Sequence, residues 1–455
     1  MDKPSGISAD CVDRIVPTFP LMPIRLPDQP IVQLALDFVN LEPALRAADE
    51  AVPAGIPWIE AGTPLIKAVG LDAVRRLRER FPKAIIVADM KIMDAGRTEV
   101  EIAKKAGADV VMVLAASTDA TVRECVEAGA HVGVGIGCDL VGVADPVARA
   151  KQVEALGVDL VSVHVPIDQQ MQGITPFAML EKVAKAVAIP VSCAGGLTAE
   201  TAARAVAAGA RICIVGGTIT KAPDAKAAAN AVLAAMRGAP VTATNVRQRV
   251  GLDRIREVLN RVSTPNLSDA MHRGGAIRGF TNRNPAARLC GPARTVTAAP
   301  GDWSKPVQAI DRCQPGEVLV IDAADQFPAL WGGLASLTAV KRGLGGVLIY
   351  GACRDLAEIL KTGLALWSTK TCPDAGEPRG IGAFDLPVLI DHRQIMPGDW
   401  LVGDEDGLVH IPAAKVVEVG NRAADIYERE ERLAAEIGRG RTLAEIADLK
   451  TWEQK

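Results

Sequence analysis

Two carboxylates and a lysine follow an apolar run in the first half of the chain. Asp89, Lys91 and Asp94 come directly after residues 84–88, whose sequence is Ala-Ile-Ile-Val-Ala. Such a run is typical of a buried parallel strand, and strand alternation places Asp89 and Lys91 on the same side. Carboxylates can hold a divalent metal ion, and an ammonium group can stabilise an oxyanion. A solvated salt-bridge cluster is the alternative that these three residues leave open.

The composition is that of a globular protein with more than one domain. The chain has 455 residues, a net charge of −3, 49% hydrophobic residues and 23% charged residues. This length predicts two domains, and the charge gives no reason to expect nucleic acid or a membrane as a partner. The apolar runs have the length of strands, too short to cross a membrane. The nine cysteines are scattered singly and predict buried thiols in a reducing cytoplasm.

From about residue 30 the chain alternates short β-branched runs with amphipathic segments rich in Ala, Glu, Lys and Arg. The apolar runs begin near Ile31, Ile56, Ala84, Asp109, His131, Asp159, Ile189 and Arg211. Eight such units predict an α/β fold, a (β/α)8 TIM barrel, in which chemistry sits where the strands end. A doubly wound open sheet is the alternative, but no GxGxxG motif follows the first strand.

The regular alternation of strand-like and helical segments stops after the predicted barrel. We predict an N-terminal extension over residues 1–29, the barrel over 30–236, a linker over 237–250 and a separate α/β domain over 251–455. The last domain ends in a long charged helix, and its short predicted strands are Arg294–Ala299, Val318–Asp322, Gly346–Tyr350, Pro387–Ile390, Trp400–Gly403 and Leu408–Ile411.

Polar residues and glycine pairs stand at the predicted ends of the barrel strands. In chain order they are Asp37, Glu60, Asp89, Lys91, Asp94 and His164, then the pairs Gly195-Gly196 and Gly216-Gly217. The strand ends of a barrel converge on one face, so these residues predict a site with carboxylates, a lysine and a base. Backbone N–H groups of the glycine pairs suit a phosphate. For His164, a satisfied histidine on an apolar strand is the alternative.

These motifs resemble the orotidine-phosphate-decarboxylase superfamily, in its branch of hexulose-6-phosphate synthases and 3-keto-gulonate-6-phosphate decarboxylases, over about residues 29–236. The resemblance rests on residues 35–37, 59–64, 88–94, 194–196 and 215–222. It implies Glu60 and Asp89 as ligands of Mg²⁺ or Mn²⁺. Lys91 would neutralise a 1,2-enediolate and His164 would move the C1 proton. Asp37 and Asp94 join the catalytic set, Asp94 by reaching a neighbouring subunit, which implies a dimer.

Two positions bear on the reaction that the resemblance implies. The decarboxylase branch has Arg after the first glycine of strand 8, where this chain has Gly217. This favours the synthase reaction, aldol addition of ribulose 5-phosphate to formaldehyde, with decarboxylation of a keto-gulonate phosphate as the alternative. The synthase relatives have His-Thr-Gly where this chain has His164-Val165-Pro166.

The C-terminal half carries a second constellation of residues. Trp331-Gly332-Gly333-Leu334 precedes Arg354-Asp355 and Glu358, with twenty residues between Gly333 and Arg354. The pattern resembles the RraA-like family, which includes class II 4-hydroxy-4-methyl-2-oxoglutarate aldolases. The resemblance implies a pyruvyl group held by the backbone amides of Gly333 and Leu334 and by Arg354, with Asp355 on the metal.

Two readings of this second domain stay open. It can act on a keto acid, as an aldolase or oxaloacetate decarboxylase. The family also contains a protein inhibitor of ribonuclease E, so a regulatory or oligomerising module without chemistry is the alternative. Taken together, the sequence predicts a bifunctional, cytoplasmic homo-oligomer, with a barrel dimer and a C-terminal trimer or hexamer, acting on small molecules.

Overall fold

The computed structural model describes residues 29–240 and 249–446, which form two compact units. The first unit contains residues 29–170 and 175–240, and the second contains residues 171–174 and 249–446. Residues 1–28 of the predicted extension and 241–248 of the predicted linker lie outside the described residues, so both assignments stay predictions. Among the helices that are described, none has the length and apolar character needed to cross a membrane.

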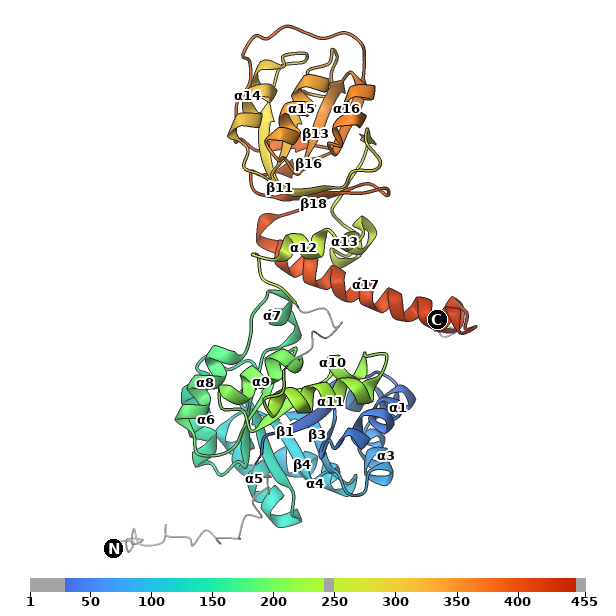
Figure 1. The fold of residues 1–455 in the computed structure, drawn as a ribbon. Helices are drawn as coiled ribbons and strands as arrows, with labels where there is room; N and C mark the ends of the chain where they lie inside the picture. Colours follow the sequence, from blue (N-terminus) through green and yellow to red (C-terminus); the bar gives the residue numbers. More distant parts are fainter. Residues whose placement is uncertain (1–28, 241–248, 447–455) are drawn as a thin grey trace, which may run out of the picture. The chain divides into compact units, whose positions relative to one another are not determined.

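Eight parallel strands close into a barrel in the first unit, and this confirms the predicted fold (Figure 1). They are β1 (Ile31–Leu36), β2 (Trp58–Ala61), β3 (Ile85–Ile92), β4 (Val110–Leu114), β5 (Gly135–Asp139), β6 (Leu160–His164), β7 (Val191–Ala194) and β8 (Ile212–Val215). The helices are α1 (Leu41–Ala51), α2 (Thr63–Val69), α3 (Asp72–Arg80), α4 (Gly96–Lys105), α5 (Asp119–Val132), α6 (Pro146–Ala155), α7 (Ile167–Met171), α8 (Phe177–Ala186), α9 (Ala199–Ala207), α10 (Gly217–Thr220) and α11 (Ala225–Met236).

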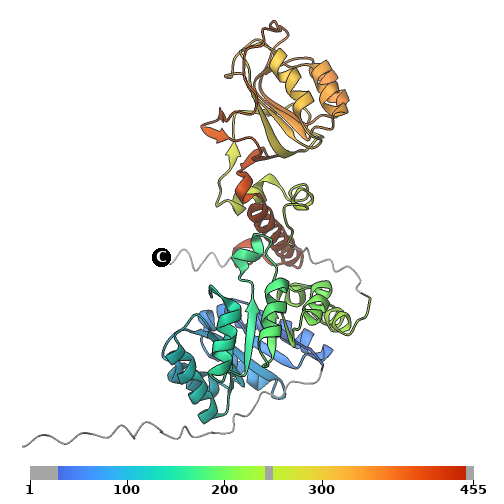
Figure 2. The same cartoon turned by 90° about the vertical axis from the view of Figure 1, so that its left-hand side faces the viewer.

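Strand alternation builds the inside of this barrel in layers. Ile31, Trp58, Val87, Leu160 and Ile212 pack together as an apolar layer. The intervening strand residues pack against the surrounding helices, which Figures 1 and 2 show outside the strands. Because side chains repeat with a period of two, the next inward positions toward the carboxyl ends lie directly above the apolar layer. On β1 and β2 these positions hold Gln33 and Glu60, which are polar and buried.

The fifth strand begins later than predicted. His131 belongs to the last turn of α5, not to a strand. That helix ends at Val132 and is capped by Gly133, whose φ of 71° lies in the left-handed region that glycine adopts without strain. The apolar run beginning at His131 therefore contains the end of the helix, and β5 starts at Gly135.

The second unit is built on one eight-stranded sheet in the order β10-β14-β13-β12-β11-β17-β18-β9. Its strands are β9 (Ala276–Ile277), β10 (Thr281–Asn282), β11 (Leu289–Thr297), β12 (Val318–Asp322), β13 (Gly346–Cys353), β14 (Leu366–Thr371), β17 (Trp400–Gly403) and β18 (Leu408–Ile411), beside the hairpin β15 (Val388–Ile390) and β16 (Arg393–Ile395). Its helices are α12 (Ile255–Leu259), α13 (Thr264–Ala270), α14 (Ser304–Arg312), α15 (Gly333–Lys341), α16 (Leu356–Thr362), α17 (Val416–Gly438) and α18 (Leu443–Ile446).

Strands β11 to β14 run parallel, and the predicted site residues Arg354 and Asp355 directly follow β13. Helices α14, α15 and α16 cover one face of the sheet (Figure 1). The β15–β16 hairpin packs on the other face. The predicted strands Val318–Asp322, Trp400–Gly403 and Leu408–Ile411 have these bounds in the structure. The strand predicted at Arg294–Ala299 begins earlier, at Leu289, because its first half pairs with β17 and its second half with β12.

Candidate functional site

Four ionisable side chains meet at the carboxyl ends of β3, β5 and β6. Lys91 Nζ lies 2.7 Å from Asp89 Oδ2 and 3.2 Å from Asp139 Oδ2. His164 Nδ1 lies 3.0 Å from the same oxygen of Asp139. An ionised carboxylate only accepts hydrogen bonds, so His164 donates through Nδ1 and keeps Nε2 for exchange with a substrate. The fold therefore brings together Asp89, Lys91 and His164, which the sequence placed on one face.

The backbone of Lys91 departs from a regular strand. Its φ is 49°, and the pairing of β3 with β4 shifts register between Ala88 and Ile92. A positive φ is uncommon for residues other than glycine, and local irregularities of this kind change the direction of a side chain. Here the irregularity lets the Lys91 ammonium reach Asp139 on β5, two strands away. Simple alternation could not have predicted this contact.

Asp139 was not among the predicted site residues. It ends β5, is 3% exposed, and accepts a hydrogen bond from the Val141 N–H through its other oxygen at 3.0 Å. The sequence does contain a signal for Asp139. This residue stands at the end of the run Gly135–Asp139, just as Asp37 and Asp89 directly follow the apolar runs before them. A strand that begins at His131, as predicted, would end before Asp139, whereas the strand in the structure begins at Gly135 and ends at Asp139.

The charges in this cluster support one another. Burial by itself would lower the pKa of Lys91, but the carboxylates of Asp89 and Asp139 raise it above its ordinary value. Burial would raise the pKa of Asp139, yet the hydrogen bond and charge of His164, together with the charge of Lys91, lower it. At neutral pH the lysine is therefore a cation and Asp139 an anion.

Glu60 lies deeper in the barrel, on β2. It is 7% exposed, and Gln33 Nε2 donates a 2.5 Å hydrogen bond to its Oε2. Burial raises the pKa of Glu60 well above its ordinary value, and the charges of Asp89 and Asp37 raise it further. Carboxylates crowded together in a buried place repel one another, and a bound cation relieves that repulsion.

The pair Glu60 and Asp89 suits a divalent metal held together with substrate. Mg²⁺ keeps several waters and is often bound by one or two carboxylates plus substrate oxygens. Thr63 Oγ1 donates to Asp89 Oδ2 at 2.6 Å and so fixes the orientation of that carboxylate. Over residues 29–240 and 249–446, no group of three or more His, Cys, Asp or Glu side chains is arranged as a complete metal-binding set. The residues fit Mg²⁺ or Mn²⁺, and the metal stays a prediction.

We expect Glu60→Gln to raise the Tm of the metal-free protein by a few degrees at neutral and mildly alkaline pH. The folded-state pKa of Glu60 lies above the ordinary 4.5, so its contribution to stability is lost as the pH rises through that higher value. Glutamine can keep the bond to Gln33 and has no charge to bury. Thermal unfolding followed against pH measures this. A Tm that is unchanged, or lower at every pH, would contradict the predicted burial of charge.

Asp37 stands at the mouth of the barrel after β1. Its side chain is exposed at the mouth of the barrel. Partial burial of its carboxylate among the strand ends and the negative charge of Asp89 nevertheless raise its pKa. A Cβ on Gly62 would collide with its carboxylate, and a Cβ on Gly216 would lie 3.7 Å from its Oδ2. Gly62 therefore makes room for Asp37, and Gly216 borders it at an ordinary contact distance.

The glycine pair after β7 forms a tight loop. Gly195 and Gly196 have φ values of 123° and 66°, and a Cβ on Gly195 would lie 3.1 Å from the Cβ of Val165. By contrast, Asp94 is exposed on the loop after β3, where its charge adds to burial in raising the pKa of Glu99 in α4. Its contact with a neighbouring subunit stays a prediction.

In the second unit, Gly333, Arg354 and Asp355 gather at the end of β13. The Arg354 N–H donates to the Trp331 carbonyl at 3.0 Å, which joins the two motifs. Asp355, with a φ of 61°, turns the chain into α16, and its Oδ2 accepts the Gly333 N–H at 3.1 Å. The same oxygen lies 3.7 Å from Arg354 Nε. All three residues are at the surface, and Leu334 is 84% exposed.

The structure also explains why a glycine stands at position 333. A Cβ there would lie 2.9 Å from the Cβ of Glu358 on α16, closer than such contacts are found. The amide of Gly333 is already bonded to Asp355, whereas the resemblance implies that it binds a pyruvyl group. The pyruvyl-binding role stays a prediction, and it requires Asp355 to give up its hydrogen bond to the Gly333 amide.

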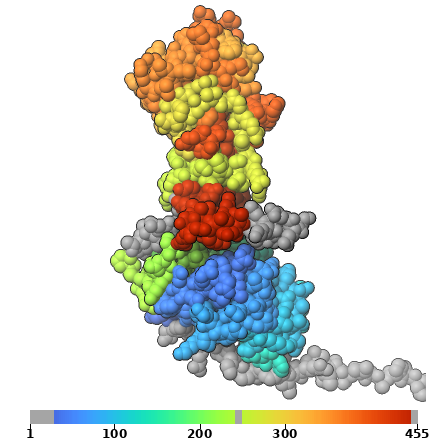
Figure 3. All heavy atoms as spheres, turned by 90° about the vertical axis from the view of Figure 1, so that its right-hand side faces the viewer, coloured from blue at the N-terminus to red at the C-terminus, as the bar shows by residue number. Residues whose placement is uncertain are grey.

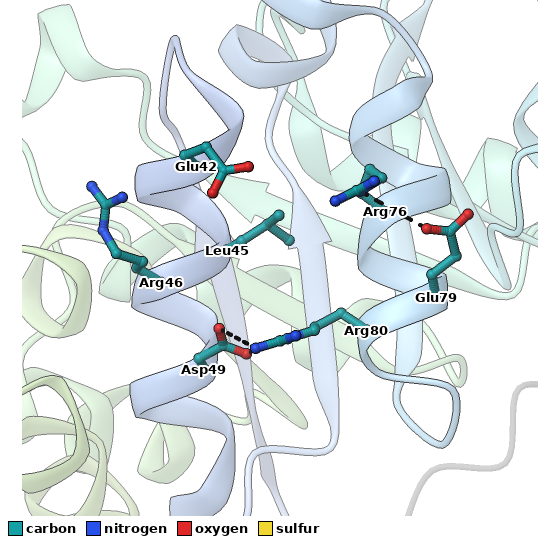
Figure 4. Close-up of a pocket in the computed structure, with 7 residues that line it drawn as sticks. All are labelled: Glu42, Leu45, Arg46, Asp49, Arg76, Glu79 and Arg80. Atoms are coloured by element: carbon teal, nitrogen blue, oxygen red, sulfur yellow. Dashed lines mark hydrogen bonds and ion pairs between the residues drawn. The ribbon is translucent and has the colours of Figure 1, made fainter.

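A charged groove of about 350 Å³ lies away from the strand ends, on the outer surface of the barrel. Figure 3 shows the side of the molecule where the N-terminal part of the barrel, in blue, faces the viewer. The groove runs between α1 and α3 and contains Asp49 with Arg80 and Glu79 with Arg76 as ion pairs (Figure 4). Because its charges neutralise one another, the groove is a solvated surface rather than a site.

Both halves of the chain match known families. Residues 30–232 match the model described as orotidine 5'-phosphate decarboxylase / HUMPS family, and residues 264–410 match the RraA-like model, described as Aldolase/RraA. A 3-hexulose-6-phosphate synthase from Mycobacterium gastri is 38% identical over 205 residues, which are 45% of this chain and 99% of that protein.

Solved structures also match the barrel. One titled 3-hexulose-6-phosphate synthase has 38% identity and a TM-score of 0.44, covering 45% of this chain and 99% of its own. A second, titled 3-keto-L-gulonate-6-phosphate decarboxylase from Vibrio cholerae O1 biovar El Tor, has 28% identity and a TM-score of 0.43, covering 46% of this chain and 98% of its own.

Proposed function

We propose that the barrel joins formaldehyde to ribulose 5-phosphate. The product is a hexulose 6-phosphate. The chain belongs to the orotidine 5'-phosphate decarboxylase / HUMPS family and carries an Aldolase/RraA domain. The observation that carries the proposal is the contact of one buried carboxylate, Asp139, with both Lys91 and His164. A base and a cation are thereby held together where carbanion chemistry needs both.

The residues of the site can perform this aldol addition in two steps. His164 Nε2 takes a proton from C1 of the sugar, and the charge that moves to the C2 oxygen is neutralised by Lys91. The C1–C2 enediolate then forms a C–C bond with the carbon of formaldehyde, and the aldehyde oxygen takes up the proton. A divalent ion held by Glu60 and Asp89 would supply further positive charge to the enediolate oxygens.

Decarboxylation of a keto-gulonate phosphate is the alternative, since it too passes through an enediolate. Gly217, without a cationic side chain, and the 38% identity to a synthase favour aldol addition. The alternative would release CO₂ from a keto-gulonate phosphate without formaldehyde, so assaying both substrates on one preparation distinguishes the two reactions.

For the second unit we propose metal-dependent cleavage of a pyruvyl keto acid. The gathering of Arg354, Asp355 and Gly333 supports it, because a guanidinium suits a carboxylate or enolate and an aspartate suits a metal. A scaffold or regulatory module has no need of this arrangement. If no keto acid yields pyruvate in the presence of Mg²⁺ or Mn²⁺, the regulatory role is favoured.

The decisive experiment compares the full chain with Asp89→Ala and Arg354→Ala, which act as controls for each other. We expect Asp89→Ala to abolish formaldehyde consumption with ribulose 5-phosphate and Mg²⁺, and Arg354→Ala to leave it intact. Release of pyruvate from oxaloacetate or 4-hydroxy-4-methyl-2-oxoglutarate should show the reverse dependence. Chelation of divalent metal should stop both reactions. Full formaldehyde consumption by Asp89→Ala would refute the proposed barrel reaction.

A further inference from the structure

Lys221 lies one helical turn beyond the glycine pair that follows β8. Its N–H donates to the Gly217 carbonyl at 3.0 Å and closes α10. A Cβ on Gly217 would lie 3.3 Å from Cε of Lys221 and 3.7 Å from its Nζ. The side chain is solvent-exposed, yet it folds back across Gly217 instead of extending away from the barrel.

The glycine pair also borders the predicted site. A Cβ on Gly216 would lie 3.4 Å from the Ala35 carbonyl and 3.7 Å from Asp37 Oδ2. Burial and the charge of Asp89 raise the pKa of Asp37, and the charges of Lys91, His164 and Lys221 act against that rise. The Lys221 ammonium is therefore close enough to Asp37 to be part of the electrostatics of the barrel mouth.

This ammonium differs from that of Lys91 in its partners. Lys91 is bonded to Asp89 and Asp139. Apart from its electrostatic interaction with Asp37, Lys221 has no hydrogen bond or ion pair to its ammonium among the residues that the structure describes. A cation beside open glycine backbone, without a carboxylate bonded to it, is suited to an anion from outside the protein.

We propose that Lys221 binds the phosphate of the substrate and makes the barrel select phosphorylated over unphosphorylated sugars. This deepens the proposed function and rests on it, because a phosphosugar must be the substrate. The two lysines then mark the two ends of that substrate. Lys91 and His164 face the carbons that react, and Lys221 holds the dianion beside Gly216 and Gly217. Such a contact binds substrate and transition state alike, so it acts on KM more than on kcat.

The test uses the full chain with Lys221→Met, Lys221→Arg and the matched control Lys226→Met, an exposed lysine in the first turn of α11. Binding of ribulose 5-phosphate, inorganic phosphate and unphosphorylated ribulose is measured by calorimetry, and KM and kcat are measured for the aldol reaction. We expect Lys221→Met to weaken binding of both phosphorylated ligands, and to raise KM, about 10-fold or more. Its kcat should change by less than about twofold. Lys221→Arg should restore most of the affinity, and Lys226→Met should behave as the wild type.

The outcomes separate this inference from the proposed reaction. If the wild type makes no hexulose phosphate but Lys221→Met still loses affinity for both phosphorylated ligands, the reaction is wrong and the phosphate role stands. If Lys221→Met binds both phosphorylated ligands as the wild type does, the inference is overturned, whatever the activity. An equal loss of affinity for unphosphorylated ribulose overturns it too, because the effect would not depend on the phosphate.

Discussion

Lys91→Met is expected to lower kcat for hexulose-phosphate formation by about 100- to 1,000-fold. The ammonium of Lys91 is the cation that lies against Asp89 and Asp139, beside the base that His164 provides. Without it, the oxygen of the enediolate gains charge in a partly buried place next to two carboxylates. The chemical step, measured in single-turnover experiments with saturating ribulose 5-phosphate, reports this directly.

Loss of Lys91 also removes the partner of two buried carboxylates, so some loss of stability is expected. Activity must therefore be measured well below the Tm of the variant, with a folded far-ultraviolet spectrum as a condition. Lys67→Met, an exposed lysine on α2, is the matched control and should retain full activity. A folded Lys91→Met protein with a normal single-turnover rate would show that Lys91 does not stabilise the enediolate.

Asp139→Asn is expected to lower kcat by about 100-fold or more, although Asp139 touches no reacting atom in this arrangement. Its carboxylate accepts the His164 Nδ1–H and the Lys91 ammonium on one oxygen. Asparagine keeps the shape but loses the charge that holds both partners, and its amide can turn an N–H toward the ring. His164 is then misoriented and the cation is less firmly placed.

The same substitution has a defined dependence on pH. The pKa of Asp139 is lowered in the folded protein, so its contribution to stability is present above the ordinary value of 3.8 and is lost as the pH falls. We therefore expect Asp139→Asn to lower the Tm at neutral pH, with a smaller difference from the wild type in acid.

Asp159→Asn provides the control for that experiment. Asp159 precedes β6, at the opposite end of that strand from His164, and accepts the Ile136 N–H at 2.8 Å. It should change stability without changing kcat. If Asp139→Asn and Asp159→Asn have the same kcat as the wild type, Asp139 serves the fold alone.

Much of the barrel could be predicted because its signals are local. Strands end where apolar runs give way to charge or glycine, and the ends of parallel barrel strands must converge. Asp37, Glu60, Asp89 and His164 could therefore be placed on one face from their positions alone. In the second unit, the resemblance implied that Gly333 and Arg354 lie together, and in the structure Asp355 contacts both.

Other features depended on contacts that are distant in sequence. Asp139 was missed because the sequence from His131 to Gly135 suits either the end of a helix or the start of a strand, and only packing decides which. Gln33 is a polar residue within the apolar run of β1, and only the barrel shows that it faces inward and bonds to Glu60 on β2.

By itself the sequence determined the number and order of the barrel strands, the chemical groups at their ends and the families that both halves resemble, because period and composition are local properties. Only the tertiary structure decided how those groups pair. The register shift that aims Lys91 and the contact of Asp139 with both Lys91 and His164 depend on residues 25 and 48 positions apart meeting in three dimensions. Such pairings are set by the closure of the barrel, which no local pattern encodes.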